Sequence, residues 1–199
     1  MNTVVHELDS LQDNKLRKTL LAAARHEISR ACNLPATPES LSAPLSVSGD
    51  FEPINASGVF VSLHLGKRLR GCIGKLRLDQ VGPTELGTAA VDAACSDPRF
   101  EPVAPGELDE LKIEISLLGP LYPCEPEQVV VGNHGLYLRS DHGSGLLLPQ
   151  VAVERGWTGE QFLQQLRKKA GLGETPTSTE QLWCFRAVVF DEDANLRQY

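Results

Sequence analysis

The stretch Arg68-Leu69-Arg70-Gly71-Cys72-Ile73-Gly74 places a cysteine between two glycines at the end of a basic, strand-like segment. Glycine has no Cβ, so it leaves room for a ligand beside the thiol and allows amide N–H groups to point outward. Neighbouring arginines favour a thiolate or an anionic ligand. The same pattern fits a small buried strand residue whose glycine neighbours admit a closely packed helix or strand. The residues alone favour this second, structural interpretation, and both stay open.

Outward from this stretch, the sequence predicts a β-hairpin. A two-residue turn at 66–67 would pair Val61 with Cys72 and place His64 on the opposite face from the thiol. A slip of one residue would reverse that conclusion. His64 is therefore interpreted as an exposed or half-buried strand histidine.

Three helices and two further strands are predicted from periodicity and end signals. Residues 11–32 have apolar side chains at every fourth position, which is typical of an amphipathic helix. A second helix is predicted at 83–95, where Pro83 suits the first turn. A third opens at Thr158, with Gln161 as its capping-box partner and Gly171 at its end. Strands are predicted at 111–118 and 182–190.

The order of these elements indicates an internal duplication. Gly58, Gly66 and Gly82 recur at one constant offset as glycines 135, 143 and 159. The predicted fold is therefore α+β, with two sub-domains of strand-turn-strand-helix-strand units, mainly antiparallel sheet with flanking helices, and a cleft between the lobes. The predicted divisions are an N-terminal helix and connecting loop over 1–57, a first repeat over 58–119 and a second repeat over 133–192.

The composition excludes several classes of protein. A net charge of −7 argues against a nucleic-acid binder, and no segment has the length and hydropathy of a signal peptide or a transmembrane helix. The five cysteines form no Cys-x-x-Cys pair and the histidines have no helical ligand spacing, so no metal site and no cofactor are predicted. Scattered cysteines, odd in number, are typical of reduced thiols, and the predicted location is the cytoplasm.

Six ordered motifs give the chain a family resemblance. They are 58–61 (GVFV) with 69–74 (LRGCIG), 97–100 (DPRF), 111–118, 134–136 (HGL), 147–152 (LLPQVA) and 156–157 (GW). In this order they resemble the AMMECR-like family, the protein A component of the AmmeMemoRadiSam systems. The resemblance covers nearly the whole chain except the region before about residue 54. It implies an α+β fold of two unequal sub-domains with a cleft, but no settled biochemical activity.

Cys72 is the candidate nucleophile, and His134 is its candidate base. His134 precedes the hairpin of the second copy, where the resembled family also has a His-Gly pair, and facing lobes would bring the two side chains together. Alternatively, His134 caps a strand start or hydrogen-bonds a backbone carbonyl.

The remaining candidates would bind substrate. Arg70 and Arg99 are candidate anion anchors, and Gly71 and Gly74 are candidate backbone donors. Asp97 pairs with Arg99 in the plainer interpretation, in which the pair only pins a loop. The other candidate is Gln150, whose amide would orient a ligand or satisfy the N–H groups of the following turn.

Two classes of function follow. In the first, the protein is an enzyme or enzyme subunit that uses the Cys72 thiol in the cleft on a small anionic substrate. In the second, it is a non-catalytic module that binds a ligand or a partner. The resemblance implies the partners: a Memo-type protein related to metal-dependent dioxygenases, and a radical S-adenosylmethionine enzyme.

Overall fold

The computed structural model describes residues 8, 11–33, 51–173 and 177–199, which form two compact units. The first unit contains the described residues up to Leu117 together with Val189–Arg197. The second contains Leu118–Val188, without 174–176, and Gln198–Tyr199. The fold is α+β, as predicted. Most of the predicted connecting loop at 33–57 and nearly all of the N-terminal segment lie outside the described residues.

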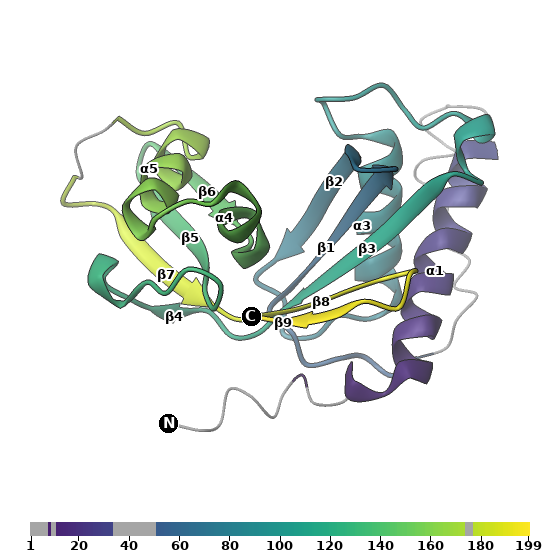
Figure 1. Cartoon of the computed structure of the whole chain (residues 1–199), viewed down its shortest axis with the longest axis horizontal. Coiled ribbons are helices and arrows are strands. Elements are labelled where there is room, and N and C mark those ends of the chain that lie inside the picture. The colour runs from purple at the N-terminus through teal and green to yellow at the C-terminus, as the bar shows by residue number, and fades with distance from the viewer. Residues whose placement is uncertain (1–7, 9–10, 34–50, 174–176) are drawn as a thin grey trace. The chain divides into compact units, whose positions relative to one another are not determined.

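The first unit is built on a five-stranded sheet in the order β2-β1-β3-β8-β9 (Figure 1). Its strands are β1 (Gly58–Leu65), β2 (Arg68–Leu76), β3 (Leu111–Leu118), β8 (Ala187–Asp191) and β9 (Leu196–Gln198). Helix α3 (Pro83–Cys95) packs on β1 and β2, and helix α1 (Asn14–Asn33) packs on α3. The predicted helix at 83–95 is confirmed, with Pro83 in its first turn and Glu85 accepting the Gly82 N–H at 3.0 Å.

One face of this sheet carries the core. Val59, Val61 and Leu63 alternate along β1 and are completely buried, and β3 buries alternate apolar residues in the same way. Removing each side chain of this size from water contributes about 1.5–3 kcal/mol. Phe60, Ser62 and His64 therefore point to the other face of β1.

The register of the β1–β2 hairpin differs from the prediction. Leu65 pairs with Arg68 as expected, but the register shifts between His64 and Leu63, so Cys72 lies opposite Ser62 and not opposite Val61. Arg70 is the extra residue of this β-bulge. Because cross-strand partners share a face, His64 lies on the same face of the sheet as Cys72, and the expectation of opposite faces was wrong.

The second unit is built on an antiparallel four-stranded sheet in the order β4-β7-β5-β6. Its strands are β4 (Tyr122–Pro123), β5 (Gly135–Ser140), β6 (Gly143–Leu147) and β7 (Gln181–Phe185). Helix α5 (Gly159–Lys169) packs on β5 and β6 and buries Phe162 and Leu166. The Thr158–Gln161 capping box is confirmed, because each residue's side chain accepts the other's backbone N–H. Gly171 adopts a positive φ of 74° just after the helix.

In the C-terminal third one prediction was wrong and one helix was missed. The strand predicted at 182–190 is two strands: β7 ends at Phe185, and after Arg186 the chain enters β8 of the other sheet. The residues on both sides of Arg186 are all apolar, so the pattern carries no sign of the change of sheet. The short helix α4 (Pro149–Arg155) was missed. It begins at Pro149 and ends at Arg155, and it is capped by Gly156, whose φ is 63°.

The cysteines also differ from the prediction. Cys124 and Cys184 form a disulfide within the second unit, which joins the segment after β4 to β7. The expectation of reduced thiols therefore holds only for Cys32, Cys72 and Cys95. Spacing gave no sign of the pair, because the two residues meet only when β4 and β7 align.

The duplicated-unit hypothesis stays a prediction, although the two units share a packing detail. A Cβ on Gly71 would lie 2.0 Å from the Ala93 carbonyl oxygen, and a Cβ on Gly143 would lie 2.1 Å from that of Ala170. In each unit a hairpin strand therefore passes closely over the last turn or the C-terminal cap of a helix. Only glycine fits in either place.

Candidate functional site

The Cys72 thiol lies half-buried on β2, beside its cross-strand neighbour Ser62. The Ser62 hydroxyl donates to Cys72 Sγ at 3.3 Å. Ser62 itself is buried, with 6% of its surface exposed. A hydroxyl donor at a sulfur stabilises the thiolate more than the thiol, because a hydrogen bond to the charged form favours that form. Sequence reasoning missed Ser62, since its position opposite the thiol depends on the bulge.

Asp97 holds the backbone beside this thiol. Its carboxylate accepts the Cys72 N–H at 2.8 Å and the Arg99 N–H at 3.1 Å, and its side chain is 1% exposed. The Arg99 guanidinium forms two further bonds to it, of 2.9 and 2.7 Å. The hydrogen bond from the Arg99 side chain, together with those from the two backbone N–H groups, lowers the pKa of Asp97 from 3.8 to about 2, although burial opposes the shift.

Arg99 connects this carboxylate to Cys72. Its Nη2 donates to the Cys72 carbonyl at 3.1 Å, and the guanidinium lies close enough to the Cys72 side chain for the sulfur to raise the pKa of Arg99. The guanidinium lies 5.4 Å from the centre of the Phe100 ring, and 54% of the Arg99 side chain is exposed. The plainer interpretation of the Asp97–Arg99 pair, an internal contact that pins a loop, therefore describes the geometry. The pinned loop places the Arg99 guanidinium beside the Cys72 thiol.

The two flanking glycines are explained by packing. Gly71 has the Ala93 carbonyl above its Cα, and a Cβ on Gly74 would lie 2.4 Å from the Phe60 ring. These contacts are those of the structural interpretation, in which a helix or strand passes close to the cysteine. They do not test whether the glycine amides also serve as donors to a ligand, and that assignment stays a prediction.

Arg70 is engaged elsewhere. Its Nε and Nη2 bind the Glu107 carboxylate at 2.8 and 2.9 Å, and its Nη1 and Nη2 donate to the carbonyls of Glu101 and Pro102 at 2.7 and 3.1 Å. The bidentate ion pair raises the pKa of Arg70 and lowers that of Glu107. Arg70 therefore fastens the 101–107 loop to β2, whereas the cation at the thiol is Arg99.

His134 and Gln150 belong to the second unit. His134 Nδ1 accepts the Val130 N–H at 3.2 Å, and its ring packs edge-on against Tyr122 with 6.1 Å between ring centres. Burial, with a smaller effect from Arg186, lowers the pKa of His134, so its imidazole is neutral at pH 7. Gln150 is buried in the first turn of α4. The pairing of His134 with Cys72 and a ligand contact from Gln150 stay predictions.

The described residues hold no cluster of three or more metal-ligating side chains. None of the helices in the described ranges combines the length and hydropathy needed to cross a bilayer.

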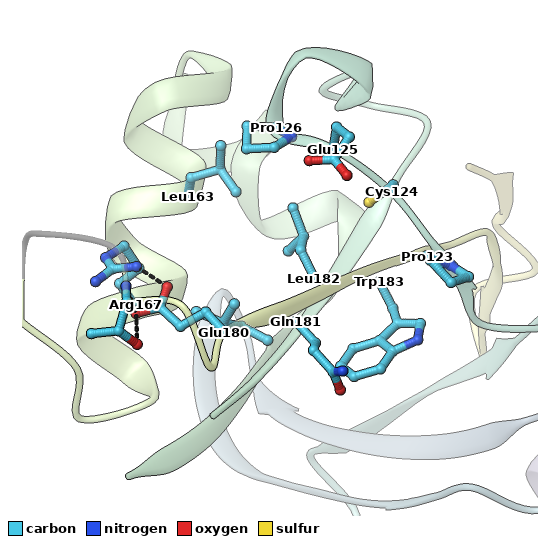
Figure 2. A pocket seen from close by; sticks show the side chains of 12 residues that line it. Pro123, Cys124, Glu125, Pro126, Leu163, Arg167, Glu180, Gln181, Leu182 and Trp183 are labelled. Atoms are coloured by element: carbon cyan, nitrogen blue, oxygen red, sulfur yellow. Dashed lines mark hydrogen bonds and ion pairs between the residues drawn. The ribbon is translucent and has the colours of Figure 1, made fainter. Parts of the chain in front are cut away.

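A separate pocket opens in the second unit, with a volume of about 490 Å³ (Figure 2). Its lining is mainly apolar and includes Leu163, Leu182 and the sulfur of Cys124. At one end the Arg167 guanidinium binds the carboxylate of Glu180, and both side chains are about nine-tenths buried. Arg167 also donates to the Gly173 carbonyl, at 3.0 Å from Nε and 2.6 Å from Nη2.

Comparison with known proteins identifies the family of this fold and site. The AMMECR1 family profile matches residues 15–190, and the chain belongs to this family. A protein of Aeropyrum pernix is 45% identical over 135 residues, which cover 64% of this chain and 58% of that protein. A protein of Methanothermobacter thermautotrophicus is 41% identical over 145 residues, 68% of this chain and 76% of that protein.

A solved structure agrees with the fold. The crystal structure of uncharacterized protein PH0010 from Pyrococcus horikoshii matches with a TM-score of 0.74 and 30% identity. The match covers 94% of this chain and 98% of that one. The resemblance stated from the six sequence motifs is therefore confirmed.

Proposed function

We propose that Cys72 is a functional thiol and that the protein is an enzyme, or a subunit of one, acting on a small anionic substrate. The observation that supports this most is the surroundings of one half-buried sulfur, which accepts a hydrogen bond from the Ser62 hydroxyl and has the Arg99 guanidinium beside it. Both interactions favour the thiolate, which is the nucleophilic form of cysteine.

Arg99 is suited to a second task. Asp97 fixes the guanidinium through two hydrogen bonds, so little side-chain entropy remains to be lost when an anion binds. The Arg99 side chain is half exposed. A carboxylate or phosphate on a substrate would meet a preoriented cation next to the reacting sulfur.

The test compares two electrophiles of different charge at each free cysteine. Cys32, Cys72 and Cys95 are all half-buried, so gross exposure does not separate them. Peptide-level mass spectrometry would follow the alkylation of each by iodoacetate and by neutral iodoacetamide. We expect the ratio of iodoacetate to iodoacetamide rates to be highest at Cys72 and to fall several-fold in Arg99→Gln. A Cys72 that reacts only in urea, or shows no preference for the anion, would refute the proposal.

The proposed pairing of Cys72 with His134 needs its own measurement. A neutral imidazole within hydrogen-bond reach, directly or through one water, would take the thiol proton. We therefore expect His134→Ala to move the pH midpoint of Cys72 alkylation upward. His142→Ala is the matched control, since His142 is an exposed histidine in the β5–β6 turn. An unchanged midpoint in His134→Ala would leave Cys72 without this base.

A non-catalytic role is the second candidate, and the polar pairs near β2 favour it. Asp97 with Arg99, and Arg70 with Glu107, hold their loops rigidly, as a preformed binding surface also requires. The partners proposed from the family resemblance are a Memo-type protein and a radical S-adenosylmethionine enzyme. If this role is correct, Cys72→Ser would bind a purified Memo-type protein as tightly as the wild type. A loss of binding or an absence of any complex would count against it.

A further inference from the structure

The first unit contains a second pair of cysteines, Cys32 and Cys95, in addition to the disulfide in the second unit. Cys32 is in the last turn of α1, Cys95 is the last residue of α3, and these two helices pack against each other. The two thiols lie close enough for each to shift the pKa of the other. Both residues are free and half-buried, so a small oxidant has access to them.

We infer that Cys32 and Cys95 form a redox site, at which a hydroperoxide converts the two thiols to a reversible disulfide that ties the end of α1 to the end of α3. The inference does not depend on the role of Cys72.

The surroundings divide the two sulfur atoms into an attacking and a resolving partner. The neighbouring Cys32 thiol lowers the pKa of Cys95 to about 7, although burial and the nearby Asp92 carboxylate oppose this. Cys95 and burial together raise the pKa of Cys32. The negative end of the α3 dipole also disfavours a Cys95 thiolate. Near Cys32, the Glu107 carboxylate disfavours and the Arg70 guanidinium favours negative charge.

The chemistry balances with a hydroperoxide as the only added reactant. The Cys95 thiolate attacks one oxygen of hydrogen peroxide, the O–O bond breaks, and hydroxide leaves as Cys95 becomes a sulfenic acid. Cys32 then attacks the Cys95 sulfur, the S–O bond breaks, and its proton leaves with the oxygen as water. Two thiols are oxidised to one disulfide, and the peroxide is reduced to two waters. Thiol reductants reverse the step.

The position of the pair gives the link a structural consequence. Asp97, which accepts the Cys72 N–H, follows Cys95 by two residues, and the Ala93 carbonyl of the same last turn contacts Gly71. A disulfide at Cys95 therefore constrains the end of α3, from which the loop with Asp97 and Arg99 departs toward Cys72.

The experiment treats the full-length protein with stoichiometric hydrogen peroxide, blocks the remaining thiols and maps tryptic peptides without reduction. We expect peptide 31–67 linked to peptide 78–99, with the loss of two hydrogen atoms, and release of both peptides by dithiothreitol. Cys72→Ser should form the same link, whereas Cys32→Ser should not and should accumulate sulfenic acid at Cys95. Peroxide that leaves both residues as thiols, or that links either of them mainly to Cys72 or to another molecule, would overturn the inference.

Discussion

Replacing Asp97 by Asn tests whether one buried carboxylate organises the loop at Cys72. The carboxylate accepts four hydrogen bonds, one from the Cys72 N–H and three from Arg99. An asparagine of the same shape keeps one oxygen acceptor, but its NH₂ group replaces the other oxygen and would face the N–H donors of Cys72 or Arg99, which it cannot accept. We therefore expect the variant to be less stable and its Cys72 to be less well positioned.

The size of the effect follows from the pKa. The fall in the pKa of Asp97 from 3.8 to about 2 corresponds to about 2.5 kcal/mol in favour of the carboxylate form. Because the Arg99 side chain is 54% exposed, solvent screening reduces the usable part to about 1 kcal/mol. The misdirected donor of asparagine adds a further cost of about 1 kcal/mol. The expected loss of unfolding free energy at pH 7 is thus about 1–2 kcal/mol.

The pH dependence has a definite sign. The folded-state pKa of Asp97 is depressed, so its stabilisation is fully present above the unfolded-state pKa and is lost as the pH falls toward the folded value of about 2. We expect the stability difference between the wild type and Asp97→Asn to be largest from about pH 5 upward. It should shrink between about pH 4 and pH 2, because the wild-type carboxyl then becomes protonated.

Urea unfolding at a series of pH values would measure this difference. Asp92→Asn is the matched control, because Asp92 pairs with Lys75 at 2.7 Å and both side chains are about one-third exposed. Such a pair contributes about 0–1 kcal/mol. Equal losses in the two variants, or a difference for Asp97→Asn that persists unchanged at low pH, would refute the reasoning.

Two further substitutions probe the packing and the helix signals. Gly71→Ala should reduce the unfolding free energy by about 1–3 kcal/mol, because its Cβ would lie 2.0 Å from the Ala93 carbonyl oxygen. Gly106→Ala, which has open space, should change the urea midpoint little, and equal effects would contradict the packing argument. Thr158→Ala should cost about 1 kcal/mol by removing the acceptor of the Gln161 N–H, and unchanged amide exchange in the first turn of α5 would contradict this.

Local signals in the sequence predicted much of the fold correctly. The proline at the start of α3, the capping box of α5 and the alternation along β3 act within one element, so they can be read without knowing what packs beside it. The glycines beside Cys72 indicated the close approach of a helix or strand, but no local pattern marked Arg70 as an extra residue that shifts the register. The break of the predicted 182–190 strand at Arg186 was not predictable either, because it arises where the chain passes from one sheet to the other.

The candidate site was predicted in part. Cys72, Asp97 and Arg99 were singled out, and the structure brings all three together. The sequence showed a positive charge at position 70, but it did not show that the Arg70 side chain turns toward Glu107, because Glu107 lies on a loop far along the chain. Ser62 carried no signal, since an isolated serine in a strand is common and its role follows from register alone.

The return of the chain to β8 after Arg186 has a consequence for synthesis. Strand β3 is flanked in the finished sheet by β1 and β8, but β8 and β9 follow the second unit in the chain and leave the ribosome after it. Until then β3 is an open edge with unpaired N–H and C=O groups beside a hydrophobic face. Nascent chains that stall within the second unit would therefore expose an edge able to pair with a neighbouring chain, which makes this interval prone to aggregation.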